Sequence, residues 1–517
     1  MEQTLLLSQI HGEKCWPMVD KISPCEEACP LNTDVPSYVM AIAQGKLKEA
    51  LAIIRQTNPL PAVCGRVCHH PCEEKCNRDK LDEPIAIQWL KRLAADYEVM
   101  GNGLEKPSPV ERTRSEKVAI VGSGPAGLTA AYDLIRKGYG VTVYEASPVI
   151  GGMLVLAIPD FLLPQQIVEK EVSYIRDLGV EFKTGISIGK DFTLEHLFER
   201  GYRAILLATG AHASQRLGIP GEDLEGVFDA LSFLREVKFG ARVKVGDRVG
   251  VIGGGNVAID ASRTALRLGA KEVFILYRRS RKEMPARDDE VEVAEAEGVK
   301  IEYLVAPLEI FGNGGRMGGL RCTRMELGEP DASGRRRPIP IKGSQFIIEL
   351  DTVIAAIGQV PHLSFMKEVS GIGTTLAGTF KVDPDTLATN LPGVFAAGDC
   401  VTLPGTVTDA MAAGRMTAIS IDRYLRGEDL KEGHEVKAKE VFEIDEKMIP
   451  QFFPRKARWQ MTCVPERNRI RGFDEVMQGY LLSEGVEEAK RCLNCRMCGN
   501  CIFERNQICF EQGMRLL

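Results

Sequence analysis

Cysteines gather at short, regular intervals near the start of the sequence, where they could bind metal. The chain has 517 residues and 15 cysteines. Because thiolates at such spacing on loops and helix ends can converge on a cuboidal [4Fe-4S] cluster, we expect iron-sulfur ligation here. Seven thiols cannot supply four ligands to each of two cubanes, so either one cluster forms or a second cluster has a non-cysteine ligand. The candidate ligands are Cys15, Cys25, Cys29, Cys64, Cys68, Cys72 and Cys76.

A second group of cysteines lies near the end of the sequence. Its members are Cys492, Cys495, Cys498, Cys501 and Cys509. Three successive C-x2-C steps are typical of ferredoxin ligation, although the closing cysteine-proline pair is absent. Four of these thiolates could instead surround a structural zinc ion, which has no redox role. We expect an iron-sulfur cluster in this segment, with zinc as the alternative.

A glycine-rich turn follows an apolar run at Lys117 to Val121 and opens an alanine-rich helical pattern. Its G-x-G-x-x-G spacing lets the backbone approach a pyrophosphate and points a helix N-terminus at it. The next apolar run ends in a glutamate, whose carboxylate can bind a ribose diol and would repel a 2′-phosphate. The pattern predicts a site for FAD or NAD. Its residues are Gly122, Gly124, Pro125, Ala126, Gly127 and Glu145.

The same pattern returns in the middle of the chain, so the sequence holds two nucleotide-binding units. Its turn residues are Gly253, Gly255, Asn256, Val257 and Ala258. The second strand of this unit ends in Arg278 and Arg279 instead of an acid. Guanidinium groups bind phosphate through several donors at once, so this strand end favours the 2′-phosphate of NADP(H), and Lys282 is expected to assist. The alternative is that the two arginines lie in a solvated loop.

A third stretch completes the first site. Gly398 and Asp399 follow a short apolar run, and Thr408 and Ala410 lie where an alanine-rich helix begins. Such an aspartate can bond the ribityl chain or pyrophosphate of a flavin, and the helix N-terminus can face the flavin's electron-rich edge. Cys400 has no second cysteine at the spacing of a redox disulfide, so we expect a small buried thiol there.

Hydrophobic periodicity predicts an α/β fold with helical ends. Apolar residues recur at helical spacing over Val35 to Arg55 and Pro84 to Val99, whereas short apolar runs typical of strands dominate the middle. The expected domains are a helical iron-sulfur domain (1–110), an FAD-binding domain in two parts (111–240 and 351–430), an NADP(H)-binding domain (241–350), a connector (431–472) and a C-terminal cysteine-rich segment (473–517).

The overall composition limits which partner molecules and which location we expect for the protein. A formal net charge of -6 with scattered basic residues makes nucleic acid an unexpected partner. No stretch approaches the ~18 apolar residues of a membrane span, and the first residues lack the pattern of a signal peptide. We expect a cytoplasmic protein without a membrane span.

Taken together, the ordered motifs resemble a known family, the NADPH-oxidising small subunit of bacterial glutamate synthase and its relatives. These relatives include the large subunit of NADH-dependent ferredoxin:NADP oxidoreductase. The resemblance implies two Rossmann-like domains of the pyridine-nucleotide disulfide oxidoreductase type, with FAD on the first and NADP(H) on the second. The motifs are Gly122 to Gly127, Gly151-Gly152, Ala208-Thr209-Gly210, Gly253 to Asp260, Tyr277-Arg278-Arg279, Ala355 to Gln359 and Gly398-Asp399. They add Gly152, Thr209, Gly210 and Gly358 to the expected cofactor contacts.

In this family the helical domain resembles one that holds two [4Fe-4S] clusters. The sequence departs from the glutamate synthase pattern in two places. The paired cysteines usual before Cys25 are missing, and Lys91 stands where relatives supply a Glu or Gln ligand. His69 and His70 lie within the cysteine group, and we interpret them as part of an exposed loop.

The leading hypothesis is an electron-input subunit that oxidises NADPH at FAD and passes electrons through [4Fe-4S] clusters to a partner enzyme or ferredoxin, in a hetero-oligomer. Hydride transfer between stacked rings needs orientation and no general acid or base, so no catalytic residue is nominated. One alternative is the small subunit of glutamate synthase proper. An alternative of another class is a structural or redox-sensing subunit with zinc at its cysteine-rich ends.

Overall fold

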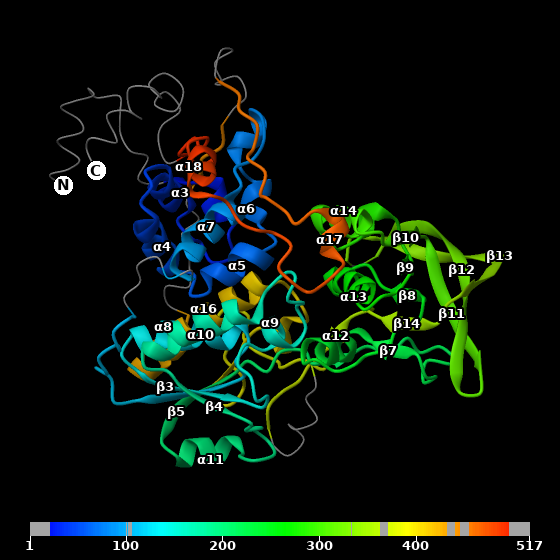
Figure 1. Cartoon of the computed structure of the whole chain (residues 1–517). Coiled ribbons are helices and arrows are strands. Elements are labelled where there is room, and N and C mark those ends of the chain that lie inside the picture. Colours follow the sequence, from blue (N-terminus) through cyan, green and yellow to red (C-terminus); the bar gives the residue numbers. More distant parts are fainter. Residues whose placement is uncertain are drawn as a thin grey trace.

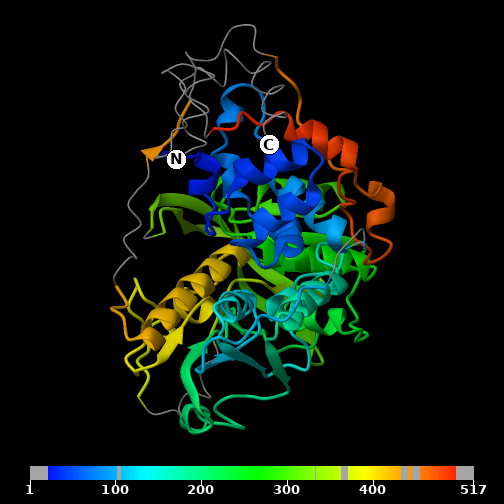
Figure 2. The same cartoon turned by 90° about the vertical axis from the view of Figure 1, so that its left-hand side faces the viewer.

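A helical domain lies against two α/β units, which sit side by side (Figures 1 and 2). The computed structural model describes residues 21–99, 101, 106–331, 333–361, 371–431, 440–444 and 454–495. In Figure 1 the blue helical domain is above, the first unit (cyan to teal, with yellow) is below it, and the green second unit is to the right.

Short helices joined by cysteine-bearing loops build the helical domain. They are α2 (Pro24–Glu27), α3 (Val35–Ala43), α4 (Leu47–Arg55), α5 (Pro61–Val67), α6 (Pro71–Glu74), the 3-10 helix η1 (Asn77–Lys80) and α7 (Ile87–Val99). The helical period from Val35 to Arg55 is divided between α3 and α4, because Gly45 adopts a left-handed φ of 73° that ends the first helix. Helices α5 and α7 cross closely, since a Cβ on Gly65 would lie 2.6 Å from the Arg92 Cα.

The first unit is a five-stranded parallel sheet with strand order β16-β5-β2-β3-β4. Its strands are β2 (Lys117–Val121), β3 (Gly140–Glu145), β4 (Glu181–Thr184), β5 (Tyr202–Leu207) and β16 (Val394–Ala396), and its helices are α8 (Pro125–Arg136), α9 (Met153–Leu156), α10 (Gln165–Asp177), α11 (Leu194–Glu199), α15 (Asp399–Thr402) and α16 (Val407–Arg426). Its central strands are continuous apolar runs because both faces of the sheet are covered. Val63 of α5 and Leu60, directly before this helix, share an apolar core with Leu154 and Val168, so the helical domain is packed onto this unit.

The second unit repeats the plan, with parallel strand order β10-β9-β8-β14-β7. Its elements are β7 (Val227–Asp229), α12 (Ala230–Lys238), β8 (Arg248–Ile252), α13 (Asn256–Arg267), β9 (Glu272–Tyr277), η2 (Arg281–Glu283), α14 (Asp288–Ala296), β10 (Lys300–Tyr303) and β14 (Thr352–Ala355). An antiparallel sheet of β11 (Val305–Asn313), β12 (Arg316–Pro330) and β13 (Arg336–Glu349) extends from its edge, at the far right of Figure 1. Short strands β6 (Ala213–Ser214) and β15 (Gln359–Val360) pair in the links between the units.

The last described segments return to the helical domain. Strand β17 (Glu440–Val441) pairs in parallel with β1 (Lys21–Ile22). The chain then passes α17 (Glu466–Arg469), near the second unit, and comes back as α18 (Leu482–Ala489), which packs on α3 and α7 (Figure 1). Within the described part of the chain, no helix is both long and apolar enough to cross a membrane.

Candidate functional site

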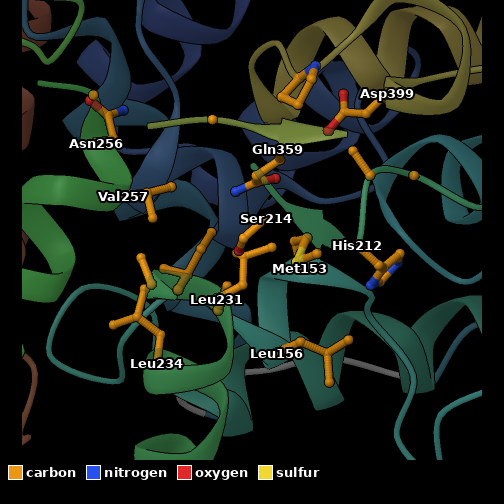
Figure 3. Close-up of a pocket in the computed structure, with 18 of the residues that line it drawn as sticks. Met153, Leu156, His212, Ser214, Leu231, Leu234, Asn256, Val257, Gln359 and Asp399 are labelled. Carbon is orange, nitrogen blue, oxygen red and sulfur yellow. The ribbon is translucent and has the colours of Figure 1, made fainter. Parts of the chain in front are cut away.

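One cavity of about 1580 Å³ runs between the two units and is lined by the glycine turns of both. A pocket for a single drug-sized ligand is typically ~300–1,000 Å³, so this cavity has room for more than one such molecule. In Figure 3, Met153 and Leu156 lie on one wall, Leu231 and Leu234 on another, and Asn256 and Val257 reach in from α13. The side chains around the middle of the cavity are therefore largely apolar.

The first glycine turn joins β2 to α8 and has no room for a larger side chain at Gly122 or Gly127. Gly122 has φ 107°, and a Cβ there would lie 2.2 Å from the Ala208 carbonyl oxygen. A Cβ on Gly127 would lie 2.1 Å from the Gly122 oxygen, and one on Gly152 would lie 2.8 Å from the Gly124 Cα. No side chain caps the start of α8, so its free N–H groups can meet an anion. The cradle fits the pyrophosphate of FAD.

Glu145 ends β3 beside this turn and is buried. One carboxylate oxygen accepts hydrogen bonds from the Ser123 N–H at 2.9 Å and the Ser123 hydroxyl at 2.6 Å. The other accepts from the Ser147 N–H at 2.8 Å. The carboxylate therefore ties two loops of the cavity wall together, and its negative charge suits a ribose diol and opposes a 2′-phosphate.

The second glycine turn joins β8 to α13 with nearly the same geometry. Gly253 has φ 147°, and a Cβ there would lie 2.2 Å from the Ala356 carbonyl oxygen. A Cβ on Gly254 would lie 2.5 Å from the ring of Tyr277. In the described structure the buried Asn256 Oδ1 has no hydrogen-bond partner, although the Asn256 Nδ2 lies 2.9 Å from His69 Nε2. An unpaired amide oxygen at a helix N-terminus fits a site that a polar ligand completes.

The basic residues after β9 have different environments. Arg278 is exposed and lines the cavity. Arg279 also lines it but is buried, with its Nη2 2.6 Å from Asp331 and its Nε donating to the Arg336 carbonyl at 2.8 Å. Arg335, at the turn between β12 and β13, reaches the same wall. Sequence reasoning missed Arg335, because only the fold brings this hairpin beside β9.

Asp399 lies where α15 begins, after Gly398 with φ 77°. Burial raises the pKa of Asp399, while the Gly405 N–H, 3.4 Å away, partly offsets that effect. Helix α16 then starts at Thr406, whose side chain accepts from the Asp409 N–H. A Cβ on Gly414 of α16 would lie 2.1 Å from the Ala126 carbonyl oxygen, so α16 and α8 are in close contact. This contact brings both helix starts to one end of the cavity.

Most of the expected cofactor residues lie on the cavity wall. They are Gly122, Gly124, Pro125, Ala126, Glu145, Gly152, Thr209, Gly210, Gly253, Gly255, Asn256, Val257, Arg278, Arg279, Gly358, Gly398, Asp399 and Ala410. The other four expected cofactor residues do not line the cavity. Gly127 packs beneath the first turn, Ala258 is buried in the second core, Thr408 is buried beside Thr406, and Lys282 is exposed.

Four thiols of the helical domain lie near enough to the ammonium group of Lys91 to affect its charge. They belong to Cys29, Cys64, Cys68 and Cys72, and all four cysteines are buried. Burial alone would lower the pKa of Lys91, but these thiols raise it above its usual value. We name these four cysteines the inner thiol set. Four buried thiols beside a buried cation fit an anionic [4Fe-4S] cluster, because the cation offsets part of the charge of the thiolates.

The inner thiol set lies next to the cavity. The Cys64 Sγ is 3.5 Å from the Met411 Sδ of α16, and Val67 and His69, on either side of Cys68, line the cavity. His69 is therefore partly buried and contacts Asn256, and His70 is also partly buried, so the interpretation of the two histidines as part of an exposed loop is wrong. The contact comes from the second unit, almost 190 residues away in the sequence, and no local pattern reveals it. Cys400 is fully buried, as expected.

Four other predicted ligands that the structure describes do not line this cavity. Cys25, Cys76, Cys492 and Cys495 line a smaller cavity between α2, η1 and the C-terminal segment. The other predicted ligands, Cys15, Cys498, Cys501 and Cys509, lie outside the described residues.

Two family profiles match the chain. The profile described as pyridine nucleotide-disulphide oxidoreductase matches residues 116–414. The profile described as dihydropyrimidine dehydrogenase domain II, 4Fe-4S cluster, matches residues 11–102. The two matches cover the two α/β units and the helical domain, respectively.

Similar proteins share most of the chain. It is 44% identical over 506 residues to the NADP(+)-dependent formate dehydrogenase subunit beta of Moorella thermoacetica, covering 92% of this chain and 71% of that protein. It is 41% identical over 515 residues to the NADPH-Fe(3+) oxidoreductase subunit beta of Geobacter sulfurreducens, covering 92% and 76%. It is 36% identical over 420 residues to the glutamate synthase [NADPH] small chain of Escherichia coli, covering 78% and 88%.

Proposed function

The chain belongs to the pyridine nucleotide-disulphide oxidoreductase family, and on that premise we propose that it oxidises NADPH and delivers the electrons to a separate redox subunit. One observation carries the proposal. A single cavity is lined by both glycine turns and by Val67 and His69, which flank the inner thiol set. NADPH, a flavin and an iron-sulfur cluster therefore have adjoining sites in one chain.

The first unit is the FAD site. Gly122, Gly124 and the start of α8 would hold the pyrophosphate, Glu145 the ribose, and Asp399 with the start of α16 the flavin end. The second unit is the NADP(H) site, where Gly253, Gly255 and the start of α13 would hold the pyrophosphate. When bound, FAD takes hydride from NADPH and releases electrons singly, and [4Fe-4S] clusters conduct them.

The chain's own residues supply position and electrostatics. Gly122 and Gly253 let the backbone approach the ligands, and the leucine and methionine side chains on the cavity walls restrict water. No acid or base is required in the middle of the cavity, because hydride transfer moves no separate proton. The Lys91 ammonium stabilises added negative charge on the inner thiol set, which favours electron transfer toward the helical domain.

The electron acceptor is proposed to be a partner subunit in a hetero-oligomer. The two relatives that match 92% of the chain are beta subunits whose names give formate or Fe(3+) as the second substrate. The glutamate synthase small chain matches 78% of it. This difference in coverage favours a partner of the first kind, a subunit that exchanges electrons with a small molecule or a metal ion, over glutamate synthase.

An anaerobic titration tests the function. Protein purified without oxygen is assayed for FAD, iron, sulfide and zinc, and is then titrated with NADPH while visible absorption and electron paramagnetic resonance (EPR) are recorded. We expect FAD bleaching together with the signals of reduced [4Fe-4S] clusters. Zinc in place of iron, or a flavin that NADPH leaves oxidised, would overturn the proposal and favour a structural subunit.

A further inference from the structure

Cys25 and Cys76 are left over once the inner thiol set is assigned. Cys25 lies on α2 and Cys72 on α6, whereas Cys29 and Cys76 lie just beyond the ends of these helices, where the chain has left the helical path. Each pair gives one thiol to the inner set and turns the other away from it. Two thiols on the far side cannot hold a cubane, which needs four ligands.

The two missing ligands come from the other end of the chain. Cys492 and Cys495 line the same small cavity as Cys25 and Cys76. We propose that these four cysteines, the outer thiol set, hold a second [4Fe-4S] cluster shared between the two ends of the protein. The C-x2-C step of the C-terminal segment thereby replaces the cysteine pair that is absent before Cys25. This inference rests on the proposed function, since it divides the thiols among the clusters that the function requires.

The C-terminal segment is firmly docked at this place. Arg491, directly before Cys492, is 2% exposed. Its guanidinium donates to Asp82 at 3.0 Å, to Glu488 at 2.8 Å and to the Glu83 carbonyl at 2.7 Å. Arg78, two residues after Cys76, donates to the Arg491 carbonyl at 3.0 Å. The hydrogen bonds of the buried Arg491 guanidinium compensate its charge and hold the backbone beside Cys492 in place. The bond from Arg78 links this backbone to the segment beside Cys76.

Hydrogen-bond donors also surround the outer sulfur atoms. The Asn77 amide nitrogen lies 3.5 Å from the Cys495 Sγ and also donates to the Phe442 carbonyl at 3.0 Å. The Asn494 N–H points to the Cys492 Sγ at 3.4 Å, and the Cys25 Sγ lies 3.4 Å from the Ser23 hydroxyl. Donors to sulfur stabilise ligating thiolates and tune the potential of a cluster.

The arrangement favours a cubane over zinc. Four thiolates around one zinc ion, each about 2.3 Å from the metal, would nearly touch one another. Among the described residues, no three cysteine, histidine, aspartate or glutamate side chains are placed to hold a metal ion. A cubane takes each thiolate on a different iron atom, so its ligands stand around a cavity, as the outer set does.

Paired substitutions test the shared cluster on the full-length protein, purified anaerobically. Cys25→Ala and Cys492→Ala are each expected to lower iron content by about four atoms per chain and to remove the same EPR signal. The double variant is expected to lose no more iron than either single variant, because both residues serve one cluster. Loss of about eight iron atoms in the double variant would mean two separate clusters and would overturn the proposal.

Control measurements distinguish the loss of one cluster from unfolding of the variant. FAD content and the circular dichroism melting curve show whether each variant is folded, and Cys64→Ala, from the inner set, is expected to remove a different EPR signal. Cys498→Ala with Cys501→Ala tests a self-contained C-terminal cluster. The proposal expects the signal lost in Cys492→Ala to survive there, and its loss would contradict the shared site. Wild-type protein with zinc and no iron would refute the proposed function itself, whereas iron with additive losses would refute only this division of ligands.

Discussion

Glu145 and Arg278 occupy matching places, at or just after the second strand of the two βαβ turns, yet one is a buried acid and the other an exposed base. The glycine turns before these two residues have nearly the same geometry. Gly122 and Gly253 both have left-handed φ, and in both a Cβ would lie 2.2 Å from a carbonyl oxygen of the adjoining strand end. We expect the shared geometry to bind pyrophosphate and the differing charge to select the nucleotide.

Some charged groups at the cavity already bind neighbouring protein groups, whereas others are available to a ligand. Glu145 already accepts three hydrogen bonds from its own loops, and Arg279 is committed to Asp331 and the Arg336 carbonyl. Arg278 and Arg335 have guanidinium groups at the cavity wall without such buried ion pairs. We therefore expect discrimination between NADPH and NADH to depend on Arg278 and Arg335 more than on Arg279.

Adding one methyl group to each glycine turn should give the largest effects. Gly122→Ala is expected to yield protein without FAD, because the new Cβ would overlap the Ala208 oxygen and φ 107° disfavours a side chain. Gly253→Ala is expected to retain FAD and lose NADPH oxidation. Flavin absorbance after gel filtration and NADPH binding measure the two sites, and each variant is the control for the other. Loss of FAD from both would show that the units are not independent.

Removing the available arginines should give the next largest effect. Arg278→Ala with Arg335→Ala is expected to raise the KM for NADPH about 10- to 100-fold, the equivalent of one or two charged hydrogen bonds, and to change the KM for NADH little. Arg337→Ala is the matched control, since Arg337 is exposed on the same hairpin and does not line the cavity. An equal rise for NADH would show that the arginines do not recognise the 2′-phosphate.

A neutral isostere in the first unit should have a smaller effect. Glu145→Gln keeps the size of the side chain but places an amide NH2 group among three donors, from Ser123 and Ser147. We expect FAD to dissociate about 10-fold more readily, as for loss of one charged hydrogen bond. Equilibrium dialysis of FAD against the wild type measures this, and Glu169→Gln on the surface of α10 is the control. Unchanged FAD affinity would mean that the loops do not need the charge.

The sequence predicted the repeated parts of the fold well. Strand β2 has the bounds of the expected apolar run, and α8 follows it as the expected alanine-rich helix, because buried parallel strands and alanine-rich helices have strong local patterns. The family resemblance, the α/β fold with its helical domain, and the FAD, NADP(H) and [4Fe-4S] cofactors are confirmed by the two profiles and the relatives.

What the sequence could not predict depends on contacts between distant segments. Arg335 reaches the second site from a hairpin more than 50 residues after Arg278, and His69 meets Asn256 across a domain boundary. The sequence predicts a separate metal-binding segment at the C-terminal cysteines, because nothing in their spacing indicates that Arg491 docks beside Cys76. The individual ligand assignments stay predictions until the variants are measured.

The smallest expected difference between the units is their response to pH. Burial raises the pKa of Asp260 well above its usual value and raises that of Glu290, and each carboxyl lines the second site. For Asp260 the neighbouring Glu290 adds to the rise, while Arg263 and Lys238 oppose it. For Glu290, Arg287 and Arg263 oppose the rise and Asp289 adds to it. An acid with a raised pKa is neutral at low pH, so negative charge appears on the wall of the proposed NADP(H) site as pH rises.

We therefore expect the dissociation constant of NADP+ to increase about 3- to 10-fold as pH rises through the range above about 6, the second pKa of a phosphate, where the charge of the ligand stays constant. Calorimetry measures it, and Asp260→Asn should flatten the dependence because one of the two titrating carboxyls is removed. Added salt should weaken the effect, since it screens the repulsion. FAD retention should not follow the same curve, because Asp260 and Glu290 belong to the second unit. A parallel loss of FAD would assign the pH response to the whole cavity and remove this last difference between the two sites.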